Sequence, residues 1–290
     1  MICSFFEFFK AITTMGIEKD IRLIALDLDG TLTNDEKKIT PETKKALMEA
    51  QKRGVRLCLA SGRPPFGMMP LAEELEMARN GGIIMAYNGG YVMDCCSGKV
   101  ITEVILDDSL LSRLHDYQEL SGMTLMTYHN DKIYTEHPND YYVHISSRNN
   151  KMQVVGVENF TRDIPKPVNK CLMVGEPEKV PHWEKEMQEA FCGEMHILRS
   201  TPYFIELLPL GIDKGPALSA ICNALGICVE NVMAFGDSYN DISMIKAAGI
   251  GVAMENAEDV VKASADIVTL NNNADGVAKV VKDFILSPKR

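Results

Sequence analysis

Short apolar runs alternate with amphipathic helical segments in the N-terminal third of the chain, and this alternation restricts the fold more than any other feature. Residues 21–26 are almost all apolar, as expected of a parallel strand buried on both faces. Residues 41–53 are predicted to form a helix, because Thr40 is a favourable N-cap residue and Gly54 follows the expected end. The pattern then continues with a strand at 55–60, a helix at 66–77 and a strand at 83–87.

The same alternation returns near Lys214. It begins with a predicted helix at 217–225 and a predicted strand at 232–235. The remaining elements are a helix at 241–248, short strands at 249–252 and 267–269, and a helix at 276–286. Together, the two parts predict an α/β fold with a doubly wound, Rossmann-like parallel sheet.

The segment between these two parts has a different pattern and is predicted to be an inserted α+β domain. Strand-like runs at 91–93 and 100–105 flank the turn residues Ser97 and Gly98, and a second hairpin is indicated around Asn130. Further strands are expected at 171–174, 195–198 and 203–208, with a helix at 178–191. We therefore divide the chain into an N-terminal extension at 1–20, a core at 21–88 and 210–290, and an inserted domain at 89–209.

Charge and composition narrow the classes of partner. The formal net charge of −10 argues against a general nucleic-acid or membrane-surface binder, because both of those partners are polyanions. A small phosphate-bearing ligand remains compatible with that charge, since a metal ion can dominate one pocket. The apolar leader at 1–14 is too short to span a bilayer, and we expect it to be dispensable. The eight irregularly spaced cysteines indicate no disulfide framework, which favours the reducing cytoplasm.

Two carboxylates follow the first predicted strand. Asp27 and Asp29 come at its carboxyl end, where open α/β sheets bind their ligands. Residues two apart on an extended chain point to the same side, so both side chains are expected to face one site. A hard divalent cation would stabilise two such close negative charges. The alternative at this point is an ordinary Asx-type turn that ends the strand, with Gly30 in the turn.

Three further segments place polar residues at the same predicted edge. Asp237, Asn240 and Asp241 follow the strand at 232–235, although Asn240 or Asp241 could simply cap the next helix. Lys214 lies beside the start of a predicted helix, where the helix dipole disfavours a positive charge. A lysine at this position is explained if it neutralises a bound phosphate; the alternative is a solvated surface lysine. Ser61 and neighbouring amides, after the strand at 55–60, could hold phosphate oxygens or form a common turn.

These four segments, in this order, resemble the haloacid-dehalogenase-like phosphatases. The residues that carry the resemblance are Asp-Leu-Asp-Gly-Thr-Leu at 27–32, Ser61, Lys214 and Gly-Asp-Ser-Tyr-Asn-Asp at 236–241. Two more runs, Tyr-Asn-Gly-Gly at 87–90 and Gly-Ile-Gly-Val-Ala-Met-Glu-Asn-Ala at 249–257, are similar to the Cof-type branch, in which a mobile cap domain covers the active site. The resemblance extends from Ile21 to the C-terminus, whereas the leader has no counterpart in the family pattern.

The resemblance implies a role for each matching residue. Asp27 would attack phosphorus and form an aspartyl-phosphate, and Asp29 would protonate the leaving oxygen and then activate water. The Asp27 carboxylate, the Asp29 backbone carbonyl and Asp237 would hold Mg²⁺, with Asp241 acting behind these ligands. The expected phosphate contacts are Ser61, Gly62, Lys214, Asn240 and the Leu28 backbone amide.

The resulting prediction is a magnesium-dependent phosphatase of small phosphate monoesters, with sugar phosphates as the expected substrates and a small phosphorylated metabolite as the partner. The alternatives are a phosphomutase, which would return the phosphoryl group to a sugar, and a non-catalytic sensor of a phosphorylated ligand. No nucleic-acid or membrane partner is expected, and the sequence does not define the oligomeric state. Substrate selection would fall to polar residues of the inserted domain. The candidates, each of which has an ordinary surface or packing role as its alternative, are Tyr128, His129, His137, Arg148 and Tyr203.

Overall fold

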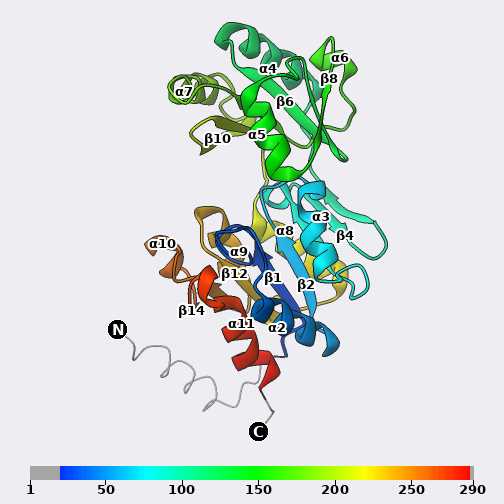
Figure 1. Cartoon of the computed structure of the whole chain (residues 1–290), viewed down its shortest axis with the longest axis vertical. Helices are drawn as coiled ribbons and strands as arrows, with labels where there is room; N and C mark the ends of the chain where they lie inside the picture. Colours follow the sequence, from blue (N-terminus) through cyan, green and yellow to red (C-terminus); the bar gives the residue numbers. More distant parts are fainter. Residues whose placement is uncertain (1–19, 288–290) are drawn as a thin grey trace. The chain divides into compact units, whose positions relative to one another are not determined.

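The computed structural model describes residues 20–287, so all of the expected N-terminal extension except Asp20 lies outside the described residues. The chain divides into two compact units (Figure 1). The first unit contains the chain up to Gly62, Leu71–Thr102 and everything from Asp213 onward. The second unit contains Arg63–Pro70 and Glu103–Ile212. None of the helices within 20–287 combines the length and the apolar character that crossing a membrane requires.

The first unit is built on an eight-stranded sheet with the order β14-β13-β12-β1-β2-β3-β4-β5. Neighbouring strands from β14 to β3 run parallel, and β4 pairs with β3 in the antiparallel direction. Every residue of β1 is buried, as the apolar sequence of this strand predicts. The strands are β1 (Leu23–Asp27), β2 (Arg56–Ala60), β3 (Ile83–Ala86), β4 (Tyr91–Asp94), β5 (Val100–Glu103), β12 (Val232–Gly236), β13 (Ile250–Ala253) and β14 (Ile267–Val268).

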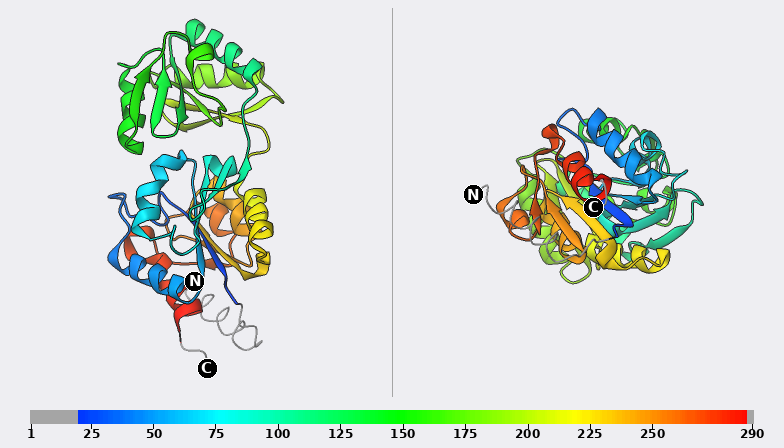
Figure 2. Two further views of the ribbon diagram at one scale, coloured as in Figure 1. Left: turned by 90° about the vertical axis from the view of Figure 1, so that its right-hand side faces the viewer. Right: turned by 90° about the horizontal axis from the view of Figure 1, so that it is seen from below.

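Helices cover both faces of this sheet (Figure 2). On one face, Leu23 and Ala25 of β1 share a core with Leu218 and Ile221 of α8. The main helices of the unit are α2 (Pro41–Lys52), α8 (Lys214–Leu225), α9 (Ile242–Ala247), α10 (Asp259–Lys262) and α11 (Gly276–Val281), and α3 (Pro65–Glu74) belongs to it from Leu71 onward. Shorter helical turns are η1 (Tyr87–Gly89), η2 (Val229–Asn231), η3 (Tyr239–Asp241), η4 (Asn272–Ala274) and η5 (Lys282–Leu286). The predicted α/β class is confirmed.

The boundary between the units differs from the one expected from the sequence. The hairpin strands β4 and β5 were expected to begin the inserted domain at 89, but they extend the sheet of the first unit. Apart from Arg63–Pro70, the chain enters the second unit only at Glu103. The physical reason is that the short turn η1 lets β4 fold back beside β3, where Val92 is fully buried. The alternation typical of a hairpin indicates its strands but not the sheet that they join.

The second unit is an α+β structure with a six-stranded sheet of order β10-β11-β9-β6-β7-β8. Its strands are β6 (Thr124–His129), β7 (Lys132–Thr135), β8 (Gln153–Gly156), β9 (Cys171–Val174), β10 (Met195–Thr201) and β11 (Phe204–Pro209). Its helices are α4 (Asp108–Ser121), α5 (Tyr141–Asn150), α6 (Phe160–Asp163) and α7 (Val180–Ala190). Leu125, Phe160 and Phe191 belong to its buried core. The helices α4, α5 and α6 and the strand β8 were not predicted from the sequence.

Candidate active site

The candidate site lies at the carboxyl ends of three adjacent parallel strands. Asp27 is the last residue of β1, and it pairs in register with Ala60, the last residue of β2. On the other side of β1, the strand β12 ends at Gly236, and Asp237 follows directly. The sheet therefore brings together chain segments that are about two hundred residues apart in the sequence.

Lys214 connects these strand ends. It is the first residue of α8, and its side chain is fully buried. Its Nζ donates to Asp27 Oδ1 at 2.7 Å, to Asp241 Oδ1 at 2.6 Å and to the Ala60 carbonyl at 3.0 Å. These three bonds use the three donors of an ammonium group. The alternative of a solvated surface lysine is therefore wrong.

Asp241 is a rigid support rather than an exposed cap. One of its oxygens binds Lys214, and the other accepts hydrogen bonds from the backbone N–H groups of Asp237 and Ser238, both at 3.0 Å. The carboxyl group thus fixes the loop that follows β12, and it is completely buried. A hydrogen-bonded helix start is present, as the capping alternative proposed, but the same side chain also holds Lys214.

Asp237 is held from the loop that follows β1. Thr31 donates from Oγ1 to Asp237 Oδ1 at 2.7 Å. Gly30 adopts a φ of +86°, and a Cβ atom at this position would come within 2.5 Å of Asp237 Oδ2. Only glycine therefore permits this close approach. Thr31 belongs to the motif at 27–32, but sequence reasoning gave it no role.

The cluster carries more negative than positive charge. One ligand oxygen from each of Asp27, Asp237 and Asp241 lies within 4.8 Å of the others, and Lys214 is the ammonium that binds this group. Burial raises the pKa of Asp27 to about 8, assisted by Asp241 and opposed by Lys214. Burial likewise raises the pKa of Asp237 to about 6, against the hydrogen bond from Thr31. Burial acts to lower the pKa of Lys214, but Asp27 and Asp241 outweigh it and raise that pKa.

Asp29 lies beyond the end of β1, in the loop that follows it. The strand ends at Asp27 and the chain turns at once, so Asp29 is not on extended chain beside it. Its carboxylate pairs with Lys37 at 2.8 Å and is 39% exposed, compared with 10% for Asp27. Strand alternation therefore does not set the direction of the Asp29 side chain, and the expectation that both carboxylates face one site stays a prediction. Asp29 is nonetheless near enough to act on the pKa of Asp237.

The expected phosphate contacts lie in loops around this cluster. Leu28 follows Asp27 directly and is fully buried. Ser61 and Gly62 follow β2, and the Ser61 backbone N–H bonds to the Met85 carbonyl at 2.9 Å. Asn240 lies in η3, exposed to solvent, and donates from Nδ2 to Asn88 Oδ1 at 2.9 Å. Asn88 had been noted only as part of a motif, so its contact with Asn240 is a feature that sequence reasoning missed.

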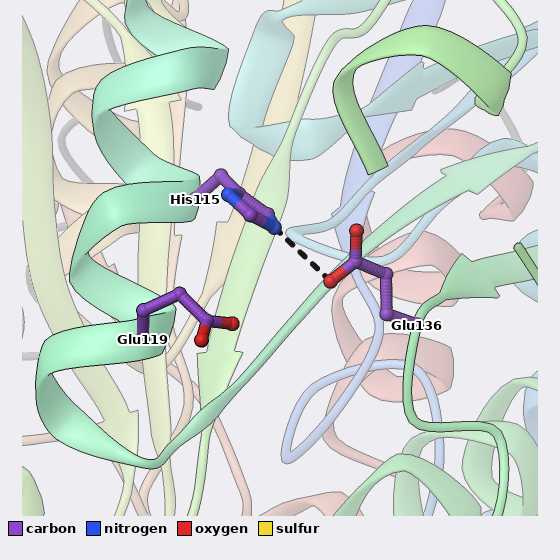
Figure 3. A group of neighbouring side chains, drawn as sticks. All are labelled: His115, Glu119 and Glu136. Atoms are coloured by element: carbon purple, nitrogen blue, oxygen red, sulfur yellow. Dashed lines mark hydrogen bonds and ion pairs between the residues drawn. The ribbon is translucent and has the colours of Figure 1, made fainter. Parts of the chain in front are cut away.

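The second unit contains another group of potential metal ligands: His115, Glu119 and Glu136 (Figure 3). The carboxylate of Glu136 accepts hydrogen bonds from His115 Nε2 at 3.0 Å, Gln118 Nε2 at 2.8 Å and the Phe160 backbone N–H at 2.7 Å. These bonds join α4 to the end of β7 and the start of α6. We interpret Glu136 as a structural acceptor, because its oxygens already have these partners.

The candidate substrate-selecting residues of the second unit are not equivalent. Tyr128 is buried, and its hydroxyl group bonds to Ser146 Oγ at 2.8 Å, so its side chain packs in the interior. Tyr203 stacks on Tyr142, with ring centroids 5.7 Å apart. His137 and Arg148 are exposed, and His129 is half-buried.

Comparison with known proteins identifies the class of this chain. It belongs to the haloacid dehalogenase-like hydrolases, because the model of that family matches residues 24–281. The crystal structure of a haloacid dehalogenase-like hydrolase from Bacteroides thetaiotaomicron is similar, with a TM-score of 0.88 and 43% identity, over 90% of this chain and 98% of that chain.

Two curated relatives are named for particular phosphate esters. The 5-amino-6-(5-phospho-D-ribitylamino)uracil phosphatase YcsE of Bacillus subtilis is 34% identical over 92% of this chain and 97% of its own length. The pyridoxal phosphate phosphatase YbhA of Escherichia coli is 30% identical over 91% of this chain and 99% of its own length. The predictions of the superfamily and of a phosphatase are therefore confirmed.

Proposed function

We propose that this protein is a Mg²⁺-dependent phosphatase that hydrolyses small phosphate monoesters through a phosphorylated Asp27. The observation that carries the proposal is the cluster of Asp27, Asp237, Asp241 and Lys214 at the edge of the sheet, in which only Asp237 is partly exposed. Phosphoryl transfer depends above all on positioning and on neutralising charge. This cluster supplies both a fixed nucleophile and an excess of oxygen ligands for a cation.

We assign the phosphoryl chemistry to Asp27, at the end of β1, and the proton transfers to Asp29, in the loop that follows. Asp27 is held by Lys214 at the strand end, which fits a nucleophile that must meet phosphorus in one orientation. Asp29 is more exposed and lies on a loop, which fits a group that gives a proton to the leaving oxygen and later accepts one from water.

The residues present fit a divalent cation. Three carboxylates face one ammonium, which leaves two negative charges when all of them are ionised. The burial that raises the pKa values of Asp27 and Asp237 makes this state costly without a cation. The Asp27 carboxylate, the Asp29 carbonyl and Asp237 would hold Mg²⁺, which when bound neutralises charge on the transferring phosphoryl group. Asp241 would support these ligands without binding the cation itself, because its two carboxylate oxygens already have hydrogen-bond partners.

The phosphate would be bound by groups from several loops. Lys214 supplies a buried positive charge, and Ser61, Gly62, Asn240 and the Leu28 amide supply hydrogen-bond donors around it. Such donors stabilise charge best when they are fixed before the substrate arrives. The hydrogen bonds of Lys214 to Asp27, Asp241 and the Ala60 carbonyl support such pre-organisation.

The substrates that we propose are small phosphate monoesters. The two curated relatives named above act on a phosphoribityl compound and on pyridoxal phosphate, and both are small phosphate monoesters. We expect sugar phosphates and polyol phosphates to be hydrolysed in preference to phosphoproteins or nucleic acids. We place the protein in the cytoplasm, because the seven cysteines within 20–287 are all free thiols.

A panel of phosphate esters tests the proposal, with free phosphate as the readout. Hexose, pentose and ribityl phosphates should be hydrolysed in Mg²⁺, and replacement of Mg²⁺ by Ca²⁺ should inhibit hydrolysis, because Ca²⁺ accepts more ligands and a looser geometry. Transfer of the phosphoryl group to sugar without release of phosphate would identify a phosphomutase. Binding of esters without any turnover would identify a sensor. Full activity after exhaustive chelation would reject the metal assignment.

A further inference from the structure

The turn between β3 and β4 has an unusual backbone. Tyr87, Asn88 and Gly89 all have positive φ values, of 51°, 56° and 100°. Asparagine tolerates this left-handed conformation better than most residues, and glycine adopts it without strain. A Cβ atom at Gly89 would come within 2.6 Å of the Ala217 Cβ atom and 2.8 Å of the Asp213 carbonyl oxygen. The turn is therefore packed tightly against the start of α8, the helix whose first residue is Lys214.

Asn88, at the centre of this turn, connects two loops of the candidate active site. Its backbone N–H donates to the Ser61 carbonyl at 2.9 Å. A Cβ atom placed on Gly62 would lie 3.3 Å from Asn88 Nδ2, so the side chain of Asn88 lies beside that residue. Its Oδ1 accepts the hydrogen bond from Asn240 Nδ2 at 2.9 Å. The loops after β2 and β12 flank β1, and Asn88 thus joins the two sides of the strand that ends in Asp27.

The direction of the Asn88–Asn240 bond matters for binding an anion. A side-chain amide has one end that donates and one end that accepts. An amide free to rotate can present its oxygen to a phosphate, which repels it. In the structure Asn88 turns its carbonyl oxygen toward Asn240, so the NH₂ group of Asn240 faces that oxygen and the second N–H of the group remains a donor.

We propose that Asn88 is a positioning residue that orients the amide of Asn240, so that Asn240 presents an N–H to the bound phosphate. This inference rests on the proposed function, because it takes Asn240 as one of the phosphate contacts. It adds a residue from a fifth chain segment to the site. It also gives the left-handed turn at 87–89 a function beyond linking two strands, because the turn places the Asn88 side chain between Gly62 and Asn240.

The variant Asn88→Gly separates the side chain from the backbone. Glycine retains access to the left-handed conformation, so the turn can persist while the bond to Asn240 is lost. Asn130→Gly is the matched control. Asn130 is also left-handed, with a φ of 53°, and it lies exposed in the β6–β7 hairpin of the second unit.

The experiment measures the affinity of the full-length protein for inorganic phosphate in Mg²⁺ by calorimetry. It compares the wild type with Asn88→Gly, Asn240→Ala, the double variant and Asn130→Gly. We expect Asn240→Ala to weaken binding about tenfold, as for loss of one hydrogen bond to a charged group. Asn88→Gly should weaken binding by a similar factor, the double variant should be no weaker than Asn240→Ala, and Asn130→Gly should match the wild type.

Steady-state kinetics with an aryl phosphate supply the second readout. Asn88→Gly should raise KM while retaining most of kcat, which also demonstrates that the variant is folded. Wild-type phosphate affinity in Asn88→Gly would overturn the inference, and so would additive losses in the double variant, because Asn88 would then act independently of Asn240. Either result leaves the proposed function intact if the wild type hydrolyses phosphate esters. A wild-type protein that neither binds phosphate nor hydrolyses any ester rejects both.

Discussion

The two units each bury a lysine, and the two lysines differ in how many carboxylates surround them. In the second unit, Lys170 pairs with Glu206 at 2.9 Å, and both side chains are largely buried. In the first unit, Lys214 pairs with Asp27 and Asp241, and the Asp237 carboxylate lies close to both of these aspartates. The charges of the Lys170 pair balance, whereas the Lys214 cluster has a surplus of negative charge.

We interpret this difference as one between a structural ion pair and a cluster that favours binding of a cation. A balanced buried pair can persist on its own, because each charge satisfies the other. A surplus of buried negative charge is costly unless a proton or a cation is taken up. The raised pKa values of Asp27 and Asp237 express that cost, and a divalent cation would relieve it. Burial of a lysine therefore does not by itself indicate a functional site.

The largest expected effect is on turnover. Asp27→Asn should reduce kcat by about 10⁴-fold or more, because an amide is a poor nucleophile and the remaining cluster offers no replacement at the same position. The isosteric change keeps the volume at the end of β1, so thermal unfolding should show an intact fold. Residual activity of a few per cent in the purified variant would remove Asp27 from the role of nucleophile.

The second prediction concerns the balanced pair. Lys170→Met leaves Glu206 buried without its partner and should lower the free energy of unfolding by about 3–5 kcal/mol. The double variant with Glu206→Leu should recover most of this loss, because an apolar pair of similar volume replaces both charges. The turnover number with an aryl phosphate should stay within about tenfold of the wild type, since neither residue is assigned to the chemistry. A loss of turnover comparable to that of Asp27→Asn would show that the two lysines do not differ as we describe.

The third prediction is a pH dependence of the free energy of unfolding. We expect it from the Lys214 cluster, with its surplus of carboxylates, and not from the Lys170–Glu206 pair. The pKa of Asp27 is raised to about 8 in the folded, metal-free protein, from 3.8 as the ordinary value. The folded state therefore binds this proton more tightly than the unfolded state does. The protonated Asp27 stabilises the fold fully below about pH 4, and this stabilisation is lost as the pH rises through 8. Mg²⁺ binds the ionised form, so its apparent affinity should rise up to about tenfold per pH unit below 8.

Thermal unfolding between pH 5 and 9, with and without Mg²⁺, measures this effect. The stabilisation by Mg²⁺ should grow with pH and level off above 8, and Asp27→Asn should flatten the dependence. Stabilisation that is independent of pH in the wild type would argue that no proton is displaced when the cation binds.

The sequence predicted the strand ends well because their signals are local. An apolar run followed by acidic residues indicates both a buried parallel strand and a polar edge, and the structure places Asp27, Asp237 and Lys214 together as the strand order requires. The partners of a buried group are not local. Lys214 also binds Asp241 and the Ala60 carbonyl. These contacts depend on how α8 packs on the sheet, which no motif in the sequence indicates.

Three features escaped sequence reasoning for related physical reasons. The turn directly after Asp27 sets the position of Asp29, and strand alternation does not apply beyond the strand end. The hairpin at 91–103 joins the first sheet, because pairing partners are chosen in three dimensions. The sequence did not decide whether Tyr128 contacts the substrate or packs in the interior, and the structure buries it with its hydroxyl group bonded to Ser146 of α5.

The central claim is that Asp27 forms a covalent intermediate that Asp29 helps to hydrolyse, and Asp29→Asn with an activated aryl phosphate tests it most directly. An aryl leaving group needs little protonation, so Asp27 should still be phosphorylated, but water would lack its general base. Rapid mixing should show a burst of about one aryl alcohol per active site, then a steady rate at least about a hundredfold below the wild type. Mass spectrometry should locate one phosphoryl group on Asp27. A steady rate equal to that of the wild type, without a burst and without phosphorylated Asp27, would contradict the account.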